Sequence, residues 1–308
     1  MGARICTDYT NTMDLDAIGV IDLKTLNPIR GFGMYASYWG LETAPFSKSH
    51  DIRHFHESEV HEEALSRLLY LIEERRRCGL LCGGPGTGKS MLLKIIDDQV
   101  RRSQRQSVLL NLPGLTGDEI PRRLAQELGI FPLPTDVYSA WRAVEDHLLS
   151  MLAFEHQAVI MFDGLERAGR GGLEAVERLV QLADNVSGGL TVILATRSER
   201  LPIEAARVAE QIDLRADLLP LDTIQTADYI TDILTQCGRT DVTFTPEALR
   251  RLAELSEGIP RAIDRLADLS MLAAMSDELP FVDETVLEQV AAELQPETER
   301  VSQPIHFG

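Results

Sequence analysis

The chain is poor in cysteine and in basic residues. Its four cysteines, Cys6, Cys78, Cys82 and Cys237, lack the spacing of a zinc site. We therefore expect buried free thiols in a reducing compartment. Lys and Arg number 30 against 48 acidic residues, which gives a net charge of −18. That charge disfavours binding to DNA through phosphate neutralisation, without excluding a local basic patch.

Long apolar runs are absent as well. No stretch approaches the ~20 apolar residues of a transmembrane helix, and the N-terminus shows no apolar segment of the signal-peptide type. These absences predict a soluble, cytoplasmic protein without a membrane span. The 308 residues, of which 44% are hydrophobic and 25% charged, are enough for one large globular domain and a smaller one.

Short apolar segments alternate with helical patterns up to residue 221. Strands are predicted at 78–82, 107–112, 158–162 and 190–195. Helices are predicted at 57–77, 91–100, 118–128, 137–153 and 173–185. Strands that alternate with helices indicate an α/β fold, in which helices flank both faces of a parallel sheet.

After residue 221 the pattern is helical throughout. Helices are predicted at 223–236, 246–256, 260–275 and 284–294, with no strand between them. The predicted organisation is an N-terminal extension without helical periodicity (1–34), an α/β core (35–221), a small all-helical domain (222–294) and a loose polar tail (295–308).

The run at 83–90, Gly-Gly-Pro-Gly-Thr-Gly-Lys-Ser, fits the pattern G-x-x-x-x-G-K-[ST] of phosphate-binding loops. It follows a predicted strand and opens a predicted helix, the context in which this pattern marks a nucleotide site. Lys89 is expected to reach the β- and γ-phosphates of ATP, and Ser90 to hold Mg²⁺. The predicted nucleotide-binding residues are Gly83, Gly84, Pro85, Gly86, Thr87, Gly88, Lys89, Ser90 and Met91.

The third predicted strand ends in Asp163, at a position that holds Mg²⁺ in related enzymes. Many such ATPases carry Glu directly afterwards, where it orients the attacking water. Here that position is Gly164. Glu166, slightly further on, takes this role if the loop turns it inward. The alternative is that Glu166 is a solvated acid and turnover is slow.

Two further positions are candidates for contact with the γ-phosphate. Thr196 and Arg197 close the fourth predicted strand, where an Arg compensates phosphate charge more strongly than a Thr, although both residues can simply cap the strand end. Arg261 lies in the first turn of a predicted helix, where the helix dipole disfavours a cation. We predict that Arg261 reaches the triphosphate; the alternative is an i,i+3 ion pair with Asp264.

Other residues favour a structural interpretation. His54, His56 and His61 are close in sequence and together could bind a metal, but nothing else supports such a site. We interpret them as solvated side chains of a loop or helix. Trp39 and Phe46 are interpreted as core anchors that can also border the adenine pocket.

Three segments, 38–46, 57–68 and 258–266, frame the phosphate loop. With that loop they resemble the AAA+ ATPases of the ExeA/GspA type, associated with general secretion, over residues 35–293. The resemblance implies a P-loop ATPase core with a helical lid, and a contact of Arg261 with the nucleotide. It also implies a homo-oligomer that acts on a protein partner.

The sequence departs from this family in three ways. Gly164 replaces the family's Glu, and Gln211 stands where a family Arg is expected, which leaves Arg207 and Arg215 as candidates for an arginine finger. Secretion members continue into a membrane helix and a wall-binding domain, so we expect this chain to lack the secretion role. The leading prediction is an AAA+ ATPase that hydrolyses ATP with Mg²⁺ to remodel its oligomer or a partner.

Two alternatives stay open. The runs 163–166 and 195–198 also resemble signalling switches of the STAND class, which turn over little ATP. DNA-associated ATPases of the transposition type share the core, but such a function needs a basic face that the acidic charge does not favour.

Overall fold

The computed structural model describes residues 28–46, 58–186, 188–197 and 206–294. Cys6, His54, His56 and the predicted tail lie outside these ranges. No helix among the described residues is long and apolar enough to cross a membrane.

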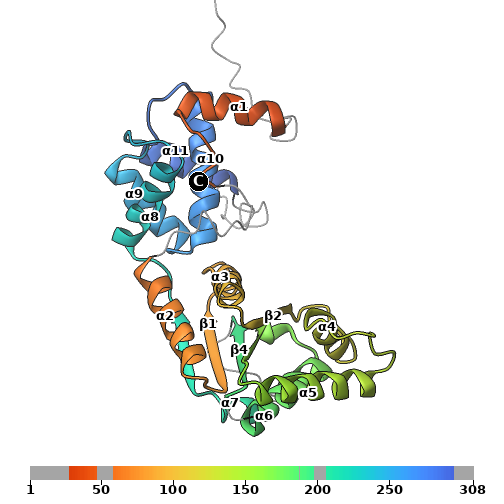
Figure 1. The fold of residues 1–308 in the computed structure, drawn as a ribbon. Helices are drawn as coiled ribbons and strands as arrows, with labels where there is room; N and C mark the ends of the chain where they lie inside the picture. Colours follow the sequence, from red (N-terminus) through yellow and green to blue (C-terminus); the bar gives the residue numbers. More distant parts are fainter. Residues whose placement is uncertain (1–27, 47–57, 187, 198–205, 295–308) are drawn as a thin grey trace, which may run out of the picture.

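A parallel sheet of five strands in the order β2-β3-β4-β1-β5 forms the centre of the larger domain (Figure 1). The strands are β1 (Cys78–Gly83), β2 (Gln106–Asn111), β3 (Ala158–Asp163), β4 (Leu190–Thr196) and β5 (Leu214–Leu218). The four predicted strands are confirmed. Because all neighbours pair in parallel, the carboxyl ends of the strands and the loops that follow them meet at one edge of the sheet.

The fifth strand is absent from the prediction. It lies at the edge of the sheet beside β1, and its outward residues Arg215 and Asp217 are exposed and charged. Its sequence, Leu-Arg-Ala-Asp-Leu, therefore lacks the continuous apolar run by which a central parallel strand is recognised.

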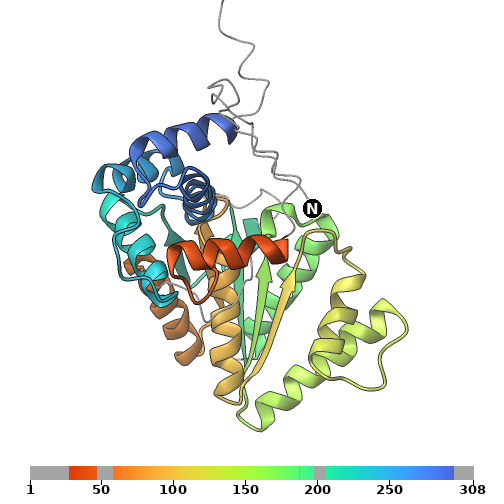
Figure 2. The same cartoon turned by 90° about the horizontal axis from the view of Figure 1, so that it is seen from above.

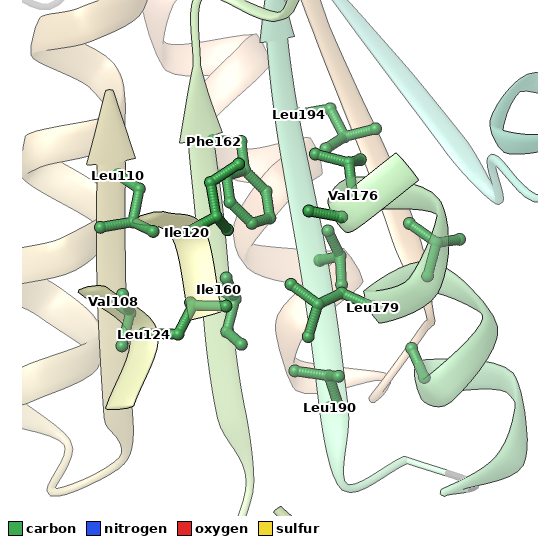
Figure 3. Close-up of a cluster of buried hydrophobic side chains, with 14 of the residues drawn as sticks. Val108, Leu110, Ile120, Leu124, Ile160, Phe162, Val176, Leu179, Leu190 and Leu194 are labelled. Atoms are coloured by element: carbon green, nitrogen blue, oxygen red, sulfur yellow. The ribbon is translucent and has the colours of Figure 1, made fainter. Parts of the chain in front are cut away.

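Helices cover both faces of the sheet, as predicted. They are α2 (Glu59–Glu73), α3 (Lys89–Arg102), α4 (Glu119–Glu127), α5 (Val137–Ala153), α6 (Arg170–Asn185) and the short α7 (Ala206–Ala209), with a 3-10 turn, η2 (Leu165–Arg167), after β3. Successive side chains of β3 point to opposite faces of the sheet. Ile160 and Phe162 pack with Ile120 of α4 and Val176 of α6 (Figure 3), whereas Met161 packs on the α2 and α3 side.

The helical domain contains α8 (Thr223–Gln236), α9 (Pro246–Ser256), α10 (Pro260–Ser276) and α11 (Glu284–Leu294), which confirms the predicted helices. Local caps explain where two of them begin. Asp222 forms a capping box with Gln225 at the start of α8, and Thr245 caps α9. These helices share a hydrophobic cluster separate from the two that flank the sheet.

An additional helix, α1 (Pro28–Trp39), lies against this domain in both views (Figure 1 and Figure 2). The sequence over residues 1–34 lacks helical periodicity, yet its described part, from Pro28 on, is helical. Two glycines, Gly31 and Gly33, weaken the local helical signal, so the helix depends on packing.

Trp39 and Phe46 are buried, as predicted, but they belong to the cluster of the helical domain and not to the α/β core. Trp39 donates a hydrogen bond from Nε1 to the carbonyl oxygen of Met271 (3.1 Å), and the Arg239 guanidinium lies 5.0 Å from its ring centre. By packing, the segment from Tyr35 to Phe46 thus joins the helical domain, which corrects its assignment to the core.

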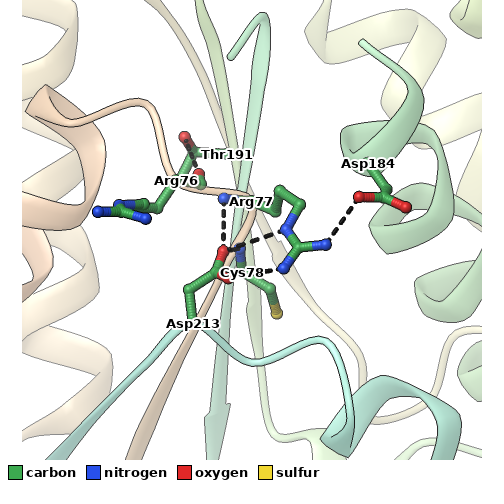
Figure 4. Close-up of polar contacts among 6 residues, drawn as sticks. All are labelled: Arg76, Arg77, Cys78, Asp184, Thr191 and Asp213. Atoms are coloured by element: carbon green, nitrogen blue, oxygen red, sulfur yellow. Dashed lines mark hydrogen bonds and ion pairs between the residues drawn. The ribbon is translucent and has the colours of Figure 1, made fainter. Parts of the chain in front are cut away.

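An ion-pair cluster lies at the amino ends of β1 and β5 (Figure 4). The Arg77 guanidinium contacts Asp213 ahead of β5 (2.8 Å) and Asp184 of α6 (2.7 Å). Asp213 also accepts hydrogen bonds from the backbone N–H groups of Arg77 (2.8 Å) and Cys78 (3.3 Å). This cluster fixes the edge strand β5 to β1.

Candidate functional site

The phosphate loop connects β1 to α3 at the carboxyl edge of the sheet. Gly86 and Gly88 have φ angles of +87° and +100°, values that favour glycine, and α3 begins at Lys89. The amino terminus of a helix of this length supplies free N–H groups and a positive dipole. The loop therefore has the backbone form of an anion site.

The chain itself binds the carbonyl oxygens of the loop. Lys89 Nζ donates to the carbonyls of Gly83 (2.7 Å) and Gly84 (2.6 Å), and the Arg261 N–H donates to that of Gly86 (3.3 Å). The N–H groups of Met91 and of the next residue donate to the carbonyl of Gly88. These contacts engage four carbonyl oxygens of the loop within the chain.

Lys89 is buried between this loop and two acids. Burial lowers the pKa of Lys89, while the charges of Glu166 and Asp163 oppose that shift. Both carboxylates therefore favour the charged form of the ammonium group. The structure thus brings three of the predicted catalytic residues together.

Ser90 and Asp163 also meet at this edge. The Ser90 hydroxyl, in the first turn of α3, donates to Asp163 Oδ2 at the end of β3 (2.5 Å). Within the described part of the chain, no group of three or more His, Cys, Asp and Glu residues could hold a metal alone. A hydroxyl with one carboxylate suits Mg²⁺, which keeps several waters and binds substrate phosphates.

Glu166 lies on the η2 turn and reaches the end of β4. The backbone N–H of Arg197 donates to Glu166 Oε2 (3.1 Å), and the Arg197 Nε lies 3.2 Å from Oε1 without the geometry of a hydrogen bond. The Glu166 side chain is 18% exposed. The loop therefore turns Glu166 inward, beside the adjacent strand end.

Gly164 has a structural reason to be glycine. Its φ is +79°, and a Cβ there would lie 2.7 Å from Pro113 Cδ and 2.8 Å from Pro113 Cγ. The family's Glu cannot occupy this position without moving the loop after β2. Pro113 is thus a residue that sequence reasoning missed, since no local pattern links it to Gly164.

Thr196 is fully buried and pairs in register with Cys82, next to the start of the phosphate loop. Arg197 is half exposed and engaged with Glu166. The strand end therefore lies beside the site, and a contact of either residue with γ-phosphate stays a prediction.

Arg261 begins α10 against the phosphate loop. A Cβ on Gly86 would lie 2.9 Å from Ile259 Cγ2 and 3.0 Å from Arg261 Cβ, so the helical domain touches the loop here. The predicted alternative, an ion pair with Asp264, is wrong. Asp264 instead accepts a hydrogen bond from the Tyr229 hydroxyl (2.8 Å), and burial raises the pKa of its carboxyl to about 6.

His61 is not solvated, which corrects its interpretation. It is 3% exposed on α2, and its ring bonds to Ser58 and to the carbonyl oxygen of Thr87 in the phosphate loop. The spacing Ser-x-x-His at the start of α2 is a local signal for the bond between Ser58 and His61 only, because Ser-x-x-Glu at that place marks a capping box.

The two arginine-finger candidates lie on the surface and pair within the chain. Arg207 contacts Glu177 (3.2 Å), and Arg215 contacts Asp217 (2.7 Å).

Comparisons with known proteins agree with this geometry. An AAA domain family matches residues 72–203. General secretion pathway protein A of Aeromonas hydrophila is 31% identical over 252 residues, which cover 79% of this chain and 45% of that protein. The chain therefore spans less than half the length of this relative.

Solved structures share the fold. Cdc6p from Pyrobaculum aerophilum matches with a TM-score of 0.64 and 16% identity, over 84% of this chain and 74% of that one. Drosophila ORC bound to DNA matches with a TM-score of 0.63 and 15% identity, over 97% of this chain and 72% of that one. The Thermotoga maritima RuvB Holliday junction branch migration motor matches with a TM-score of 0.53 and 17% identity, over 81% of this chain and 73% of that one.

The parallel sheet, the phosphate loop and the helical domain define a P-loop protein of the AAA+ class. Within this class, the chain belongs to the AAA+ ATPases of the ExeA/GspA family.

Proposed function

We propose that the chain binds ATP with Mg²⁺ at the phosphate loop and hydrolyses it to remodel its own oligomer or a protein partner. The observation that carries this proposal is the hydrogen bond between Ser90 and Asp163 (2.5 Å). It joins two oxygen ligands suited to Mg²⁺ at the mouth of a loop whose Lys89 interacts with the same carboxylate.

The proposed roles follow from position. Lys89 exchanges the carbonyls of Gly83 and Gly84 for phosphate oxygens, and Ser90 and Asp163 hold Mg²⁺, which neutralises phosphate charge. Arg261 reaches the nucleotide from the helical domain, since its backbone already touches the loop. Glu166 orients the attacking water once its contact with Arg197 loosens.

Lys89→Ala tests the proposal most directly. We expect it to abolish binding of a fluorescent ATP analogue while the thermal unfolding midpoint stays close to that of the wild type. Asp163→Asn should retain binding and lose Mg²⁺-dependent hydrolysis. Wild-type turnover in a folded Lys89→Ala protein would contradict the assignment, and an unchanged Mg²⁺ dependence in Asp163→Asn would place the metal elsewhere.

A second candidate function is a nucleotide switch of the STAND type with little turnover. Two observations favour it: position 164 excludes a Glu, and the substitute acid Glu166 is engaged by Arg197. Rapid hydrolysis by the purified protein would refute the switch. Slow hydrolysis with tight retention of nucleotide would support it.

We also propose that the chain acts on a protein partner. The relative's name associates it with general secretion, and the net charge of −18 favours protein partners over duplex DNA. Salt-sensitive binding to a DNA duplex would instead support the transposition-type alternative.

A further inference from the structure

A buried histidine joins α2 to the phosphate loop. His61 Nε2 lies 2.9 Å from the carbonyl oxygen of Thr87, and His61 Nδ1 lies 2.6 Å from the Ser58 hydroxyl. His61 and Ser58 are 3% and 5% exposed, and Thr87 is 1% exposed. Water therefore cannot easily replace these hydrogen bonds, and losing one leaves a buried polar group unsatisfied.

Chemistry fixes which atoms donate. A carbonyl oxygen only accepts, so Nε2 must carry the proton that bonds to Thr87. In the neutral ring Nδ1 is then an acceptor, and the Ser58 hydroxyl donates to it. Ser58 is the N-cap residue of α2, but its side chain makes no capping hydrogen bond. The hydroxyl thus holds the ring of His61 in place of capping the helix.

The bond to Thr87 orients one peptide unit of the loop. In a trans peptide the C=O and the following N–H point in opposite directions. Holding the Thr87 carbonyl on His61 therefore aims the N–H of Gly88 away from α2. Gly88 has φ +100°, and a Cβ on it would lie 2.7 Å from His61 Nε2, so the ring and the glycine fit against each other.

We propose that His61 is a positioning residue of the phosphate loop, which fixes the peptide between Thr87 and Gly88 so that its N–H faces the β-phosphate of a bound nucleotide. This inference rests on the proposed binding of ATP at the loop. Because the loop's N–H groups cradle phosphates shared by ATP and ADP, the effect extends to both nucleotides. His61 itself touches neither the γ-phosphate nor the attacking water.

Three variants test the proposal. His61→Phe keeps the ring volume and removes both polar atoms. His61→Gln places an amide N–H where Nε2 lies and so restores the bond to Thr87. Ser58→Ala removes only the hydroxyl that holds the ring. Leu65→Ala is the matched control, since Leu65 is also buried on α2 but packs in the cluster beside α3.

The measurements are the dissociation constants of fluorescent ATP and ADP analogues, kcat and KM, and the unfolding midpoint without nucleotide. For His61→Phe we expect both dissociation constants to rise about tenfold, with kcat at saturation nearly unchanged. His61→Gln should recover most of the affinity, and Ser58→Ala should lose a smaller part. Leu65→Ala should lower the unfolding midpoint and leave affinity unchanged.

Equal affinities for wild type and His61→Phe would overturn the inference, as would an affinity loss in Leu65→Ala that matches its loss of stability. A fall in kcat alone would assign His61 to the chemical step instead and also refute it. Lys89→Ala, measured in parallel, distinguishes a failure of the His61 inference from a failure of the proposed ATP binding. If it does not weaken nucleotide binding, the proposed function itself fails.

Discussion

The backbone at position 164 decides which residue can directly follow β3. Restoring the family's acid by Gly164→Glu should not raise the rate of ATP hydrolysis. A side chain at φ +79° with Pro113 2.7 Å from its Cβ should lower the free energy of unfolding by about 2 kcal/mol or more. Chemical denaturation and an ATPase assay measure the two effects.

A neighbouring glycine supplies the control for this change. Gly169 has φ −68°, and a Cβ there meets nothing within 4 Å. Gly169→Glu adds the same charge to the same loop and, since Gly169 is the N-cap of α6, should change the free energy of unfolding by less than about 1 kcal/mol. A stable Gly164→Glu protein that hydrolyses ATP faster would contradict this prediction. It would show that the loop around Pro113 can move to accept a side chain, and that the backbone does not require glycine at position 164.

Glu166 is the acid that the loop does place near the site. Glu166→Gln should retain ATP and lower kcat by ~10²–10⁴-fold, as expected when the group that orients water is removed. The measurement is single-turnover hydrolysis together with nucleotide affinity. Glu174→Gln is the control, because Glu174 lies on α6 with its side chain 63% exposed and, among the described residues, pairs with the exposed Arg170.

The Arg197 contact makes this prediction sharper. Arg197 holds Glu166 through its backbone N–H as well as its side chain. Removing only the Arg197 side chain therefore leaves Glu166 held by the backbone N–H of residue 197. An unchanged kcat in Glu166→Gln would mean that the protein is a switch or uses another base.

Between elements, the cluster of Arg77, Asp184 and Asp213 predicts sensitivity to acid. Burial opposes ionisation of Asp213, but hydrogen bonds from Arg77 and Cys78 outweigh it and lower the pKa of this carboxyl below its ordinary value of 3.8. Its stabilisation is thus present above that value and lost as the pH falls through the folded pKa. Arg77→Met should cost about 1 kcal/mol at pH 7 and flatten this acid-dependent loss.

Denaturation at several pH values between 7 and the acid range checks this prediction. Arg170→Met is the control, since Arg170 is 89% exposed and its pair with Glu174 contributes little. Equal acid dependence in wild type and Arg77→Met would show that other carboxylates control the transition.

Elements with a strong local signal could be predicted, and elements that depend on distant packing could not. The central strands are continuous apolar runs and the helices α8 to α11 have apolar periodicity, so both appear in the sequence. The strand β5 carries exposed Arg215 and Asp217, and α1 contains two glycines; both are stabilised by neighbours that are remote in sequence.

The site shows the same division. The phosphate loop and Asp163 follow from a motif and a strand end, and the structure brings Ser90 and Asp163 into contact. The contacts of His61 with Thr87 and of Pro113 with Gly164 join residues from different elements. No spacing rule along one segment encodes such a contact, so only the fold reveals them.

At the scale of the whole molecule, the surface arginines bear on assembly. Arg207 is 79% exposed and contacts Glu177 through one nitrogen among the described residues, whereas Arg215 contacts Asp217 through two nitrogens. Exposed pairs of this kind are worth about 0–1 kcal/mol. Either arginine can therefore leave its partner for a neighbouring subunit, and Arg207 loses less in doing so.

We accordingly predict that ATP with Mg²⁺ raises the mass of the protein in solution, as measured by light scattering with and without nucleotide. Arg207→Ala should lower turnover at least about tenfold with nearly unchanged nucleotide affinity, because a neighbour's arginine stabilises the transferred phosphoryl group. Arg215→Ala tests the second candidate in the same assay, and Arg170→Ala is the exposed control. A protein that remains monomeric and hydrolyses ATP at a rate independent of its concentration would refute the subunit-completed site, leaving Arg197 and Arg261 as the arginines that act on the nucleotide.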